Sequence, residues 1–575
     1  MKVSLKQTLN RSVMNKVVSL VSIFVVVAAA GDAFAAKVSK ERYLVIYKSS
    51  TGYKAMNNFM STESVHAAVK LNDSLSHINA MVLTANDSQQ IESLKLHPEV
   101  ALVEKEMFFP SPKPVNGFRI SPNAVKSAQH FLSSDDLEQL APIDAAVPTP
   151  IFKEGTSTPW GILAVNAGAA WDKAKAGANA RVLVLDTGID PEHPSLKVNF
   201  EQGRNFFESD TGPNPNDFID KEGHGTHCAG TIAGAYSDLN GFTGVAPLAK
   251  ILMGRVCGDL GCSNIAVAQG INWGIKQKVD VISMSLGGPM GSASERMAVA
   301  NAEAAGVVVV AASGNDGTAK VSFPAAFPTP IAVGAVDSSI VKTSFSQYGP
   351  ELDIVAPGAS VVSTVPRGSG RDSNVDITID GQTTRVKSAA FSGTRLTTAP
   401  KVAELVPVGL GKSEEFSKVN VAGKIALVSR GEIKFSEKVS NALAAKAIGV
   451  IIYNNTSGLM QGSVTEDGSE INAAVVMVEK TMGESLVKSL QSGKVISASI
   501  ATVASDYASF DGTSMATPHV AGVVALIKSA NKNLTPAQVR MIIQKTARSL
   551  SPNTNNEYGA GLIQADKAVE MAVGL

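Results

Sequence analysis

The chain lacks an excess of charge of either sign, and that absence removes whole classes of function. Its 51 Lys and Arg are matched by 51 Asp and Glu, and no long run of one charge occurs. A balanced chain gives no reason to expect binding to nucleic acid or to an anionic membrane surface. Its 44% of hydrophobic residues favours a packed core, and its 575 residues favour more than one domain.

Long apolar stretches are missing after the N-terminus, so no later segment is predicted to form a stable membrane span. The N-terminus has basic residues before a short apolar run, followed by small residues at Ala33 and Ala35. This pattern predicts a secretory signal peptide over residues 1–35, cut after Ala35 or Ala36, and hence an extracellular or periplasmic protein. A retained anchor is the alternative, although the apolar run is shorter than the ~20 residues of a spanning helix.

Only three cysteines are present, so the chain can form at most one internal bridge. Glycines lie between Cys257 and Cys262 and let a small loop close, and an exported protein can keep a disulfide. We therefore predict this bridge, with two free thiols as the alternative. Cys228 stands among small residues and is predicted to be a buried, unreactive thiol; a catalytic cysteine there is the alternative.

The segment 36–109 has the pattern of a small α+β unit. Strands are expected at 42–50, 78–86 and 100–109, and helices near Val65–Ser76 and at 88–100. Residues 110–157 are rich in Pro, Ala and Ser without a sustained period, which predicts a linker or a processed tail.

From residue 158 the pattern changes to strands that alternate with helices. One continuous apolar run ends at Asp186, another at the "SLGG" of 285–288 and a third at the "SGNDG" of 313–317. Such runs are typical of parallel strands buried on both faces. We predict an α/β fold with a doubly wound, mostly parallel sheet over 158–368 and 506–575, whose site lies beyond the carboxyl ends of the strands.

Four polar residues at strand ends and helix starts have complementary chemistry. The hydroxyl of Ser514, at a helix start, needs a base to become a nucleophile. His224 suits that task because imidazole titrates near neutrality, and a carboxylate such as Asp186 would fix its tautomer. The amide of Asn315 and the backbone N–H of Ser514 would stabilise an oxyanion. This chemistry requires no cofactor.

The motifs around these residues strongly resemble those of the subtilisin-like serine proteases, the subtilases. They are "VLDTGID", "GHGTHCAG", "SLGG", "SGNDG" and "GTSMATPHVAG", in the family's order Asp, His, Ser. The resemblance implies a serine endopeptidase that cuts proteins and peptides through an acyl-enzyme. It makes Asp186, His224 and Ser514 the catalytic triad and places Asn315 in the oxyanion hole.

The same resemblance implies the walls of the primary specificity pocket. They are Ser285, Leu286, Gly287, Gly288, Ala312, Ser313 and Gly314, with Ser322 near the floor. These residues are mostly small and none is acidic, while Asp316 is expected at the solvent-exposed rim. We therefore expect cleavage after large apolar residues, because burying an unpaired Lys or Arg charge is costly.

A whole small domain, 369–505, stands between the strand motifs and the nucleophile motif. Its "GKIALVSRG" and "GVIIYNN" resemble a protease-associated (PA) domain, a module without chemistry of its own. The stretch "FSGTRLTTAP" at 391–400 echoes the nucleophile motif, but Arg395 stands in the nucleophile's place. This echo is predicted to have no catalytic part.

The unit 36–109 resembles the inhibitor-type propeptide of subtilases through "YLVIYK", "INAMVLTA" and "HPEVALVEKE". The resemblance implies a precursor whose own propeptide assists folding and blocks the cleft until it is cut off. Subtilases often bind calcium through an aspartate at the position where this chain has Ser195. Calcium needs several oxygen ligands, and a structural calcium elsewhere, with unknown ligands, stays open.

Two other functions fit parts of the sequence. A catalytically dead subtilase would serve as a binding scaffold through its PA domain, but all four catalytic positions are intact. An esterase would need a G-x-S-x-G elbow, whereas Ser514 stands in G-T-S-M-A. The leading prediction is a secreted serine endopeptidase made as a self-processed precursor.

Overall fold

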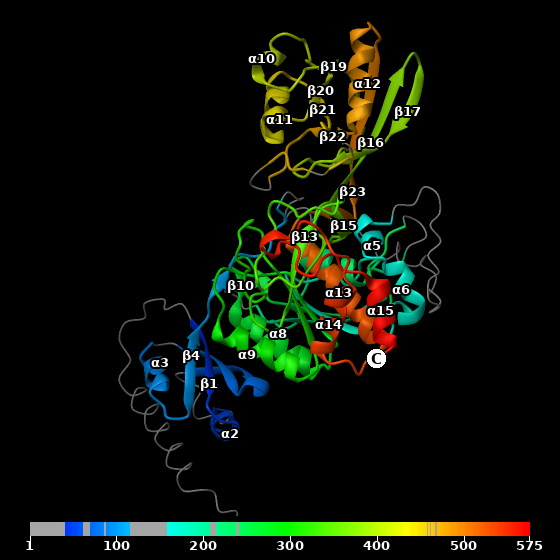
Figure 1. Cartoon of the computed structure of the whole chain (residues 1–575). Helices are drawn as coiled ribbons and strands as arrows, with labels where there is room; N and C mark the ends of the chain where they lie inside the picture. The colour runs from blue at the N-terminus through cyan, green and yellow to red at the C-terminus, as the bar shows by residue number, and fades with distance from the viewer. Residues whose placement is uncertain are drawn as a thin grey trace, which may run out of the picture.

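The structure, a computed structural model, describes nine stretches of the chain. These are residues 41–60, 69–85, 88–115, 158–207, 214–236, 241–456, 458–460, 462–465 and 469–575. The predicted signal peptide and positions 116–157 of the predicted linker lie outside the described residues. A central body has a small N-terminal unit beside it and an inserted unit at another end (Figure 1). In the described part of the chain, no helix is both long and apolar enough to cross a membrane.

A seven-stranded sheet forms the middle of the central body, and all its neighbouring strands are parallel. Its order is β14-β13-β12-β11-β6-β8-β7. The strands are β6 (Arg181–Asp186), β7 (Phe200–Asn205), β8 (Lys250–Arg255), β11 (Val281–Met284), β12 (Val308–Ala312), β13 (Ile331–Val336) and β14 (Ile354–Pro357). The predicted doubly wound parallel sheet is confirmed.

Alternation along the strands explains why both faces of this sheet are apolar. Successive side chains of a strand point to opposite faces, so Val182 and Val184 enter one core while Leu183 and Leu185 enter the other. Five helices mainly cover the first core: α6 (Ala167–Ala174), α7 (His224–Ala233), α13 (Thr513–Ala530), α14 (Pro536–Thr546) and α15 (Ala565–Val573). The second core is covered by α8 (Asn264–Lys276) and α9 (Ala293–Ala304).

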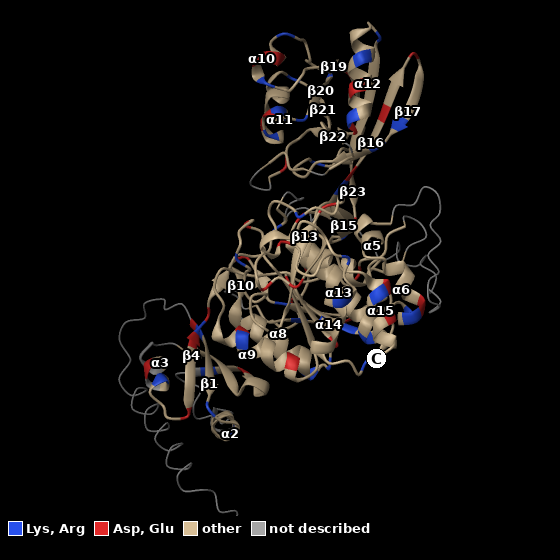
Figure 2. Ribbon diagram, viewed as in Figure 1, with Lys and Arg blue, Asp and Glu red and all other residues tan. Residues whose placement is uncertain are grey.

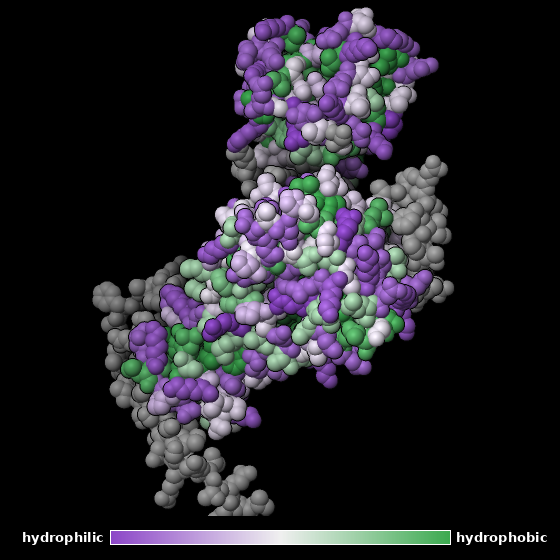
Figure 3. Space-filling view, in the orientation of Figure 1, coloured by the Kyte–Doolittle hydropathy of each residue, from purple (hydrophilic) through white to green (hydrophobic). Residues whose placement is uncertain are grey.

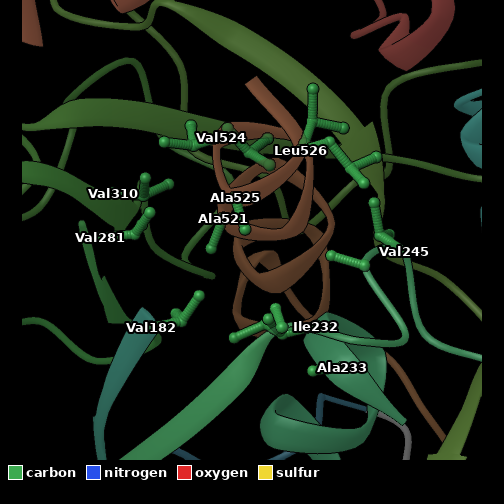
Figure 4. Close-up of a cluster of buried hydrophobic side chains, with 14 of the residues drawn as sticks. Val182, Ile232, Ala233, Val245, Val281, Val310, Ala521, Val524, Ala525 and Leu526 are labelled. Atoms are coloured by element: carbon green, nitrogen blue, oxygen red, sulfur yellow. The ribbon is translucent and has the colours of Figure 1, made fainter. Parts of the chain in front are cut away.

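Helix α13 runs through the first core and carries the predicted nucleophile near its N-terminus. Figure 4 shows Val182, Val281 and Val310 around Ala521 and Val524 of this helix. Every residue from Thr513 to Ser529 is buried. Burial at roughly 25 cal/mol per Å² of apolar surface holds the helix firmly, so its first turn presents Ser514 from a rigid support.

The N-terminal unit is a four-stranded antiparallel sheet in the order β2-β3-β1-β4. Its elements are β1 (Glu41–Tyr47), α2 (Ser50–Met60), β2 (Val69–Leu75), β3 (Ala80–Ala85), α3 (Ser88–Lys95) and β4 (Val100–Lys105). The predicted helix near Val65–Ser76 is wrong where the structure describes it, because 69–75 forms strand β2. The helix lies earlier, at Ser50–Met60. Tertiary pairing of β2 with β3 overrides the local helical pattern.

The inserted unit contains an eight-stranded sheet in the order β17-β16-β23-β19-β20-β21-β22-β18. Its strands are β16 (Gly370–Ile379), β17 (Gln382–Val386), β18 (Ser388–Ala390), β19 (Lys401–Pro407), β20 (Ile425–Ser429), β21 (Gly449–Tyr453), β22 (Ala474–Val478) and β23 (Ile496–Ser505). The echo "FSGTRLTTAP" lies in this unit and is not helical; its Ser392 and Thr394 make isolated strand bridges.

The two ends of the insertion lie side by side. β16 and β23 pair along ten residues, from Gly370 with Ser505 to Ile379 with Ile496. Next to them, β15 (Val361–Thr364) pairs with β24 (Tyr507–Phe510) in the central body. The insertion therefore leaves and re-enters the body at one place, and α13 follows directly after β24.

Charged residues of both signs are interspersed over the elements drawn in Figure 2. The face in Figure 3 mixes hydrophilic and hydrophobic side chains rather than presenting a uniform field. This surface agrees with the balanced composition of 51 basic and 51 acidic residues.

Candidate active site

Asp186 and His224 form the most buried polar pair of the site. Asp186 ends strand β6 and His224 begins helix α7, and their side chains are 0% and 2% exposed. Nδ1 of His224 lies 2.8 Å from Oδ1 of Asp186. A proton on Nδ1 donates to the carboxylate, which leaves Nε2 as the basic atom. Among the described residues Nε2 has no hydrogen-bond partner, so it is free to take a proton.

The electrostatics of this pair favour a charged imidazole. Burial lowers the pKa of His224, but its interactions with Asp186 and Cys228 together outweigh burial and raise that pKa well above its usual value. A carboxylate in this position stabilises the imidazolium that forms when a serine is deprotonated. The arrangement thus suits a general base.

Small residues make room for this pair. Gly223 before the helix has φ 89°, a left-handed conformation that favours glycine. A Cβ at Gly225 would lie 2.1 Å from the carbonyl oxygen of Gly188 and 3.1 Å from Cβ of Asp186. The glycines around His224 therefore let the helix start approach the end of β6 closely.

Ser514 is the second residue of α13, and Pro518 changes the hydrogen bonding of its carbonyl. Proline has no N–H to donate to the carbonyl four residues earlier, so the Ser514 carbonyl lacks its helical partner. The hydroxyl of Ser285 donates to it at 2.8 Å, and the thiol of Cys228 lies 3.6 Å from it. Because of Pro518, the Ser514 carbonyl is thus bonded to neighbouring elements instead of to its own helix.

Cys228 connects the two halves of the site. Its Sγ lies 3.8 Å from Nδ1 of His224 and contacts the Ser514 carbonyl. The thiol is fully buried, and burial raises its pKa, so it stays protonated near neutrality. The hydroxyl of Ser514 donates to the Ser285 carbonyl at 3.1 Å in this structure. A rotation about its Cα–Cβ bond would redirect it.

Asn315 lies beside the start of α13. Its Oδ1 accepts hydrogen bonds from the backbone N–H and the hydroxyl of Thr513, both at 2.9 Å. Because Oδ1 is occupied, Nδ2 is the atom left to donate. Together with the backbone N–H of Ser514 at the helix N-terminus, this amide can stabilise an anionic oxygen.

The predicted pocket residues come together around a side chain that the sequence reasoning missed, Gln347. The backbone N–H of Ser322 donates to the Ser313 carbonyl at 2.8 Å, and the Ser322 hydroxyl donates to Oε1 of Gln347 at 3.3 Å. A Cβ at Gly314 would lie 1.9 Å from that same Oε1. The amide of buried Gln347 therefore lies against Gly314 and Ser322, two of the residues predicted to line the pocket.

The remaining predicted residues lie on the neighbouring segments. Leu286 is buried and Gly288 makes a strand bridge with Phe323, while Ala312 ends β12. A disulfide joins Cys257 and Cys262 in the hairpin of β9 (Cys257–Gly258) and β10 (Gly261–Ser263). Asp316 is exposed.

A segment of the N-terminal region lies across this site. Strand β5 (Phe108–Phe109) pairs antiparallel with β10. Farther along, the hydroxyl of Ser111 donates to Oε2 of Glu222 at 3.1 Å, and the backbone N–H of Val115 donates to the Asp511 carbonyl at 2.9 Å. Glu222 stands two residues before His224 and Asp511 three before Ser514, so 108–115 passes over both halves of the site.

The N-terminal unit also packs against α8 and α9. Leu44, Ile46 and Ile78 join the core that these helices cover. Both carboxylate oxygens of Glu104 accept backbone N–H groups at the start of α9, at 3.0 and 3.1 Å. Buried Arg42 pairs with Glu106 at 3.0 Å. A carboxylate at a helix N-terminus is stabilised by the free N–H groups and the helix dipole.

The place that the family resemblance gives to a calcium ligand does not suit the metal here. The Ser195 hydroxyl is 2.8 Å from the Tyr507 hydroxyl, and its backbone N–H donates to Nδ1 of His193 at 3.1 Å. A hydroxyl already paired with a phenol is a poor substitute for a carboxylate ligand. His193 is buried and contacts the Asp506 carbonyl at the end of the insertion.

Three residues of the site were not predicted, and their sequence signals differ. Glu222 and Asp511 stand within three positions of His224 and Ser514, so a search beside the motifs would have found them. Gln347 lies 32 residues after Asn315 and has no local signal, because folding alone brings it to the pocket.

A parallel α/β sheet with a serine, a histidine and an aspartate gathered at one end is typical of a serine hydrolase. Comparison with known families makes this specific: the subtilase family model matches residues 177–426 and 416–561. The chain belongs to the subtilase family, and it is a serine-type endopeptidase that acts on proteins.

Individual relatives agree. Subtilisin NAT of Bacillus subtilis subsp. natto is 36% identical over 338 residues, which cover 56% of this chain and 76% of that protein. M-protease of Shouchella clausii (strain KSM-K16) is 32% identical over 420 residues, which cover 73% and 94%. The crystal structure of Apa1, a psychrophilic subtilisin-like protease from the Antarctic Pseudoalteromonas sp. AS-11, matches with a TM-score of 0.56 and 29% identity over 73% of this chain and 99% of Apa1.

Proposed function

We propose that this subtilase is secreted, that it matures by cutting its own precursor, and that Ser514, His224 and Asp186 form its catalytic triad. The observation that carries the triad is the buried 2.8 Å contact between His224 and Asp186, with Cys228 touching both His224 and the Ser514 carbonyl. His224 takes the proton of Ser514 as its oxygen attacks the peptide carbonyl. The acyl-enzyme then forms as the protonated imidazole gives that proton to the leaving amine.

Asn315 and the Ser514 backbone N–H form the oxyanion hole of this mechanism. Donors fixed in place stabilise the tetrahedral intermediate without rearranging during the reaction. All catalytic groups belong to the chain, so the proposed chemistry requires no cofactor. A structural calcium away from Ser195 stays a separate proposal, and a chelator that lowered the melting temperature without changing the chemistry would support it.

The N-terminal unit acts in this proposal as a propeptide that inhibits its own protease. Support comes from its apolar packing on α8 and α9, from Glu104 at the start of α9 and from the passage of 108–115 over the site. A substrate could not pair with β10 while β5 is there. The signal peptide and the PA identity of the insertion belong to the same proposal.

A fluorophosphonate probe tests the catalytic assignment against an inactive scaffold. The mature protein is expected to be labelled at Ser514, as located by peptide mass mapping. Ser514→Ala is expected to take up no label, and Ser285→Ala, which removes a neighbouring hydroxyl, is expected to stay labelled. Labelling at another serine would overturn the assignment, and no labelling of a folded, processed protein would favour the scaffold.

A further inference from the structure

Glu222 is a carboxylate in the cleft that forms no ion pair with a described lysine or arginine. It lies two residues before His224, and it is half-buried. In the part of the chain that the structure describes, no lysine or arginine forms an ion pair with it, and its carboxylate accepts a hydrogen bond from the Ser111 hydroxyl at 3.1 Å. A partly desolvated carboxylate with a single neutral partner is poorly compensated.

Two acids, Asp220 and Asp186, and one cation, His224, act electrostatically on Glu222. Burial raises the pKa of Glu222, and the nearby charge of Asp220 raises it further. Asp220 itself is enclosed by hydrogen bonds from Thr226, Thr187 and the backbone N–H groups of Glu222 and Gly223. Of Asp220 and Glu222, Glu222 is therefore the one that faces the bound segment.

Segment 108–115 marks the path of a bound peptide. It pairs with β10 at Phe109, touches Glu222 at Ser111 and reaches the Asp511 carbonyl at Val115. An extended chain bound at a sheet edge gives affinity through its backbone and specificity through its side chains. The side chain at the position of Ser111 is the one read by Glu222.

We propose that Glu222 makes this subsite selective for a Lys or Arg side chain of the substrate. A cation there would form an ion pair with the carboxylate, whereas Ser111 offers a single neutral hydrogen bond. The subsite is separate from the primary pocket, which Gly314, Ser322 and Gln347 build from other loops. The inference rests on the proposed triad only in that a cleavage assay reports it.

The contact between Ser111 and Glu222 also affects how strongly the chain's own segment blocks the cleft. The chain's own segment places a serine where a cation binds best, so it occupies the cleft without using the strongest available interaction. A substrate with Lys at this position therefore competes well against the segment. Ser111→Lys in the precursor is expected to strengthen the block of the cleft.

A positional scan of internally quenched peptides tests the proposal. Each position on both sides of the cut is varied among Lys, Gln and Glu, and kcat/KM is measured with the mature enzyme. At one position other than the residue before the cut, Lys is expected to exceed Glu by about tenfold, which corresponds to about 1.4 kcal/mol. In Glu222→Gln the Lys and Glu peptides are expected to have about equal kcat/KM. In Glu222→Lys the Glu peptide is expected to have the higher value.

Two control variants distinguish an effect of the Glu222 charge from an effect of the protein's overall charge. Asp259→Asn removes one negative charge from the exposed turn between β9 and β10 and is expected to keep the Lys preference. Glu222→Asp keeps the charge and is expected to retain part of it. A preference that persists in Glu222→Gln, or active wild-type enzyme without such a position, overturns the proposal. A folded wild-type enzyme that neither cleaves the peptides nor takes up the fluorophosphonate would instead refute the proposed triad.

If Glu222→Gln does not fold, salt provides a second measurement on the wild-type enzyme. A preference based on an ion pair should weaken between 0.05 and 1 M NaCl, because the Debye length falls to about 3 Å at 1 M. A Lys preference that does not change with salt would overturn the ionic basis of the proposal.

Discussion

Asn315 and Thr513 are joined by two hydrogen bonds to one atom: Oδ1 of Asn315 accepts both the backbone N–H and the hydroxyl of Thr513 at 2.9 Å. Thr513 is the first residue of α13 and directly precedes Ser514. The amide is thus held against the helix start with Nδ2 as its remaining donor. This relationship fixes the proposed oxyanion donor, Asn315, relative to the proposed nucleophile, Ser514.

Replacing this amide should damage catalysis more than binding. Asn315→Ala is expected to lower kcat by ~10²–10³ and to leave KM nearly unchanged, because the donor acts mainly on the transition state. Thr513→Val keeps the backbone bond to Asn315 and is the control for positioning, with a smaller expected loss. Steady-state kinetics on one peptide measures both variants. A rise in KM alone would assign Asn315 to substrate binding.

Maturation should depend on the enzyme's own nucleophile. Ser514→Ala, expressed in a host without other active proteases, is expected to accumulate as a precursor that retains residues near Val38 to Met107. Added active enzyme should convert this precursor, which shows that the variant is folded and can be cut. N-terminal sequencing and intact mass measure both states. A fully processed Ser514→Ala protein without added enzyme would rule out self-cleavage.

The acid limb of the activity profile should report the Asp186–His224 pair. The base must be neutral to act, and its pKa is raised well above the usual value. Activity is therefore lost as pH falls through that raised pKa, so the limb in kcat/KM should lie above about 6.5. Asp186→Asn is expected to shift the limb downward and to lower kcat by about 10⁴. A wild-type limb at or below 6.5 would contradict the assignment.

Two buried histidines outside the proposed triad should make the fold sensitive to acid. Burial lowers the pKa of His227 to about 3 and that of His519 to about 4. Below about pH 6.5 the unfolded chain binds protons at both residues and the folded chain does not. The free energy of unfolding therefore decreases as the pH is lowered. Between pH 7 and pH 5 each histidine should cost roughly 2 kcal/mol of unfolding free energy.

Denaturant unfolding of the Ser514→Ala protein at both pH values measures this loss without autolysis. The free energy of unfolding should differ less between pH 7 and pH 5 in His519→Gln than in the parent protein. The reduction should be about the contribution of one histidine, whatever the effect of the substitution at pH 7. An unchanged pH dependence in this variant would show that His519 is protonated in the folded protein.

The primary pocket should accept large apolar residues. None of the described residues predicted to line it is an acid, and burying a Phe or Leu side chain is worth ~1.5–3 kcal/mol, against ~0–1 kcal/mol for a surface pair with exposed Asp316. Peptide-library cleavage is expected after Phe, Leu, Tyr and Met, weakly after Lys and not after Asp or Glu. Dominant cleavage after Arg or Lys would refute this pocket. A preference for Ala or Gly would mean that Gln347 fills it, and Gln347→Ala should then restore large residues.

The central fold was readable from the sequence because its signals are local. Apolar runs that end in polar residues, such as the one closed by Asp186, identify parallel strands whatever they pair with. The stretch 69–75 was not readable in this way, because its strand form depends on pairing with β3. Gln347 likewise has no motif, and its place follows from the packing of distant loops.

The sequence by itself determined the family, the order of the motifs and the candidate residues Asp186, His224, Asn315 and Ser514, because side-chain chemistry and short-range spacing are written in the chain. The tertiary structure alone decided which groups touch. It placed Cys228 between His224 and Ser514, Gln347 beside Ser322, and Ser111 on Glu222. These contacts span up to 286 residues of chain, and they arise because folding buries apolar surface wherever the elements meet, which no local pattern records.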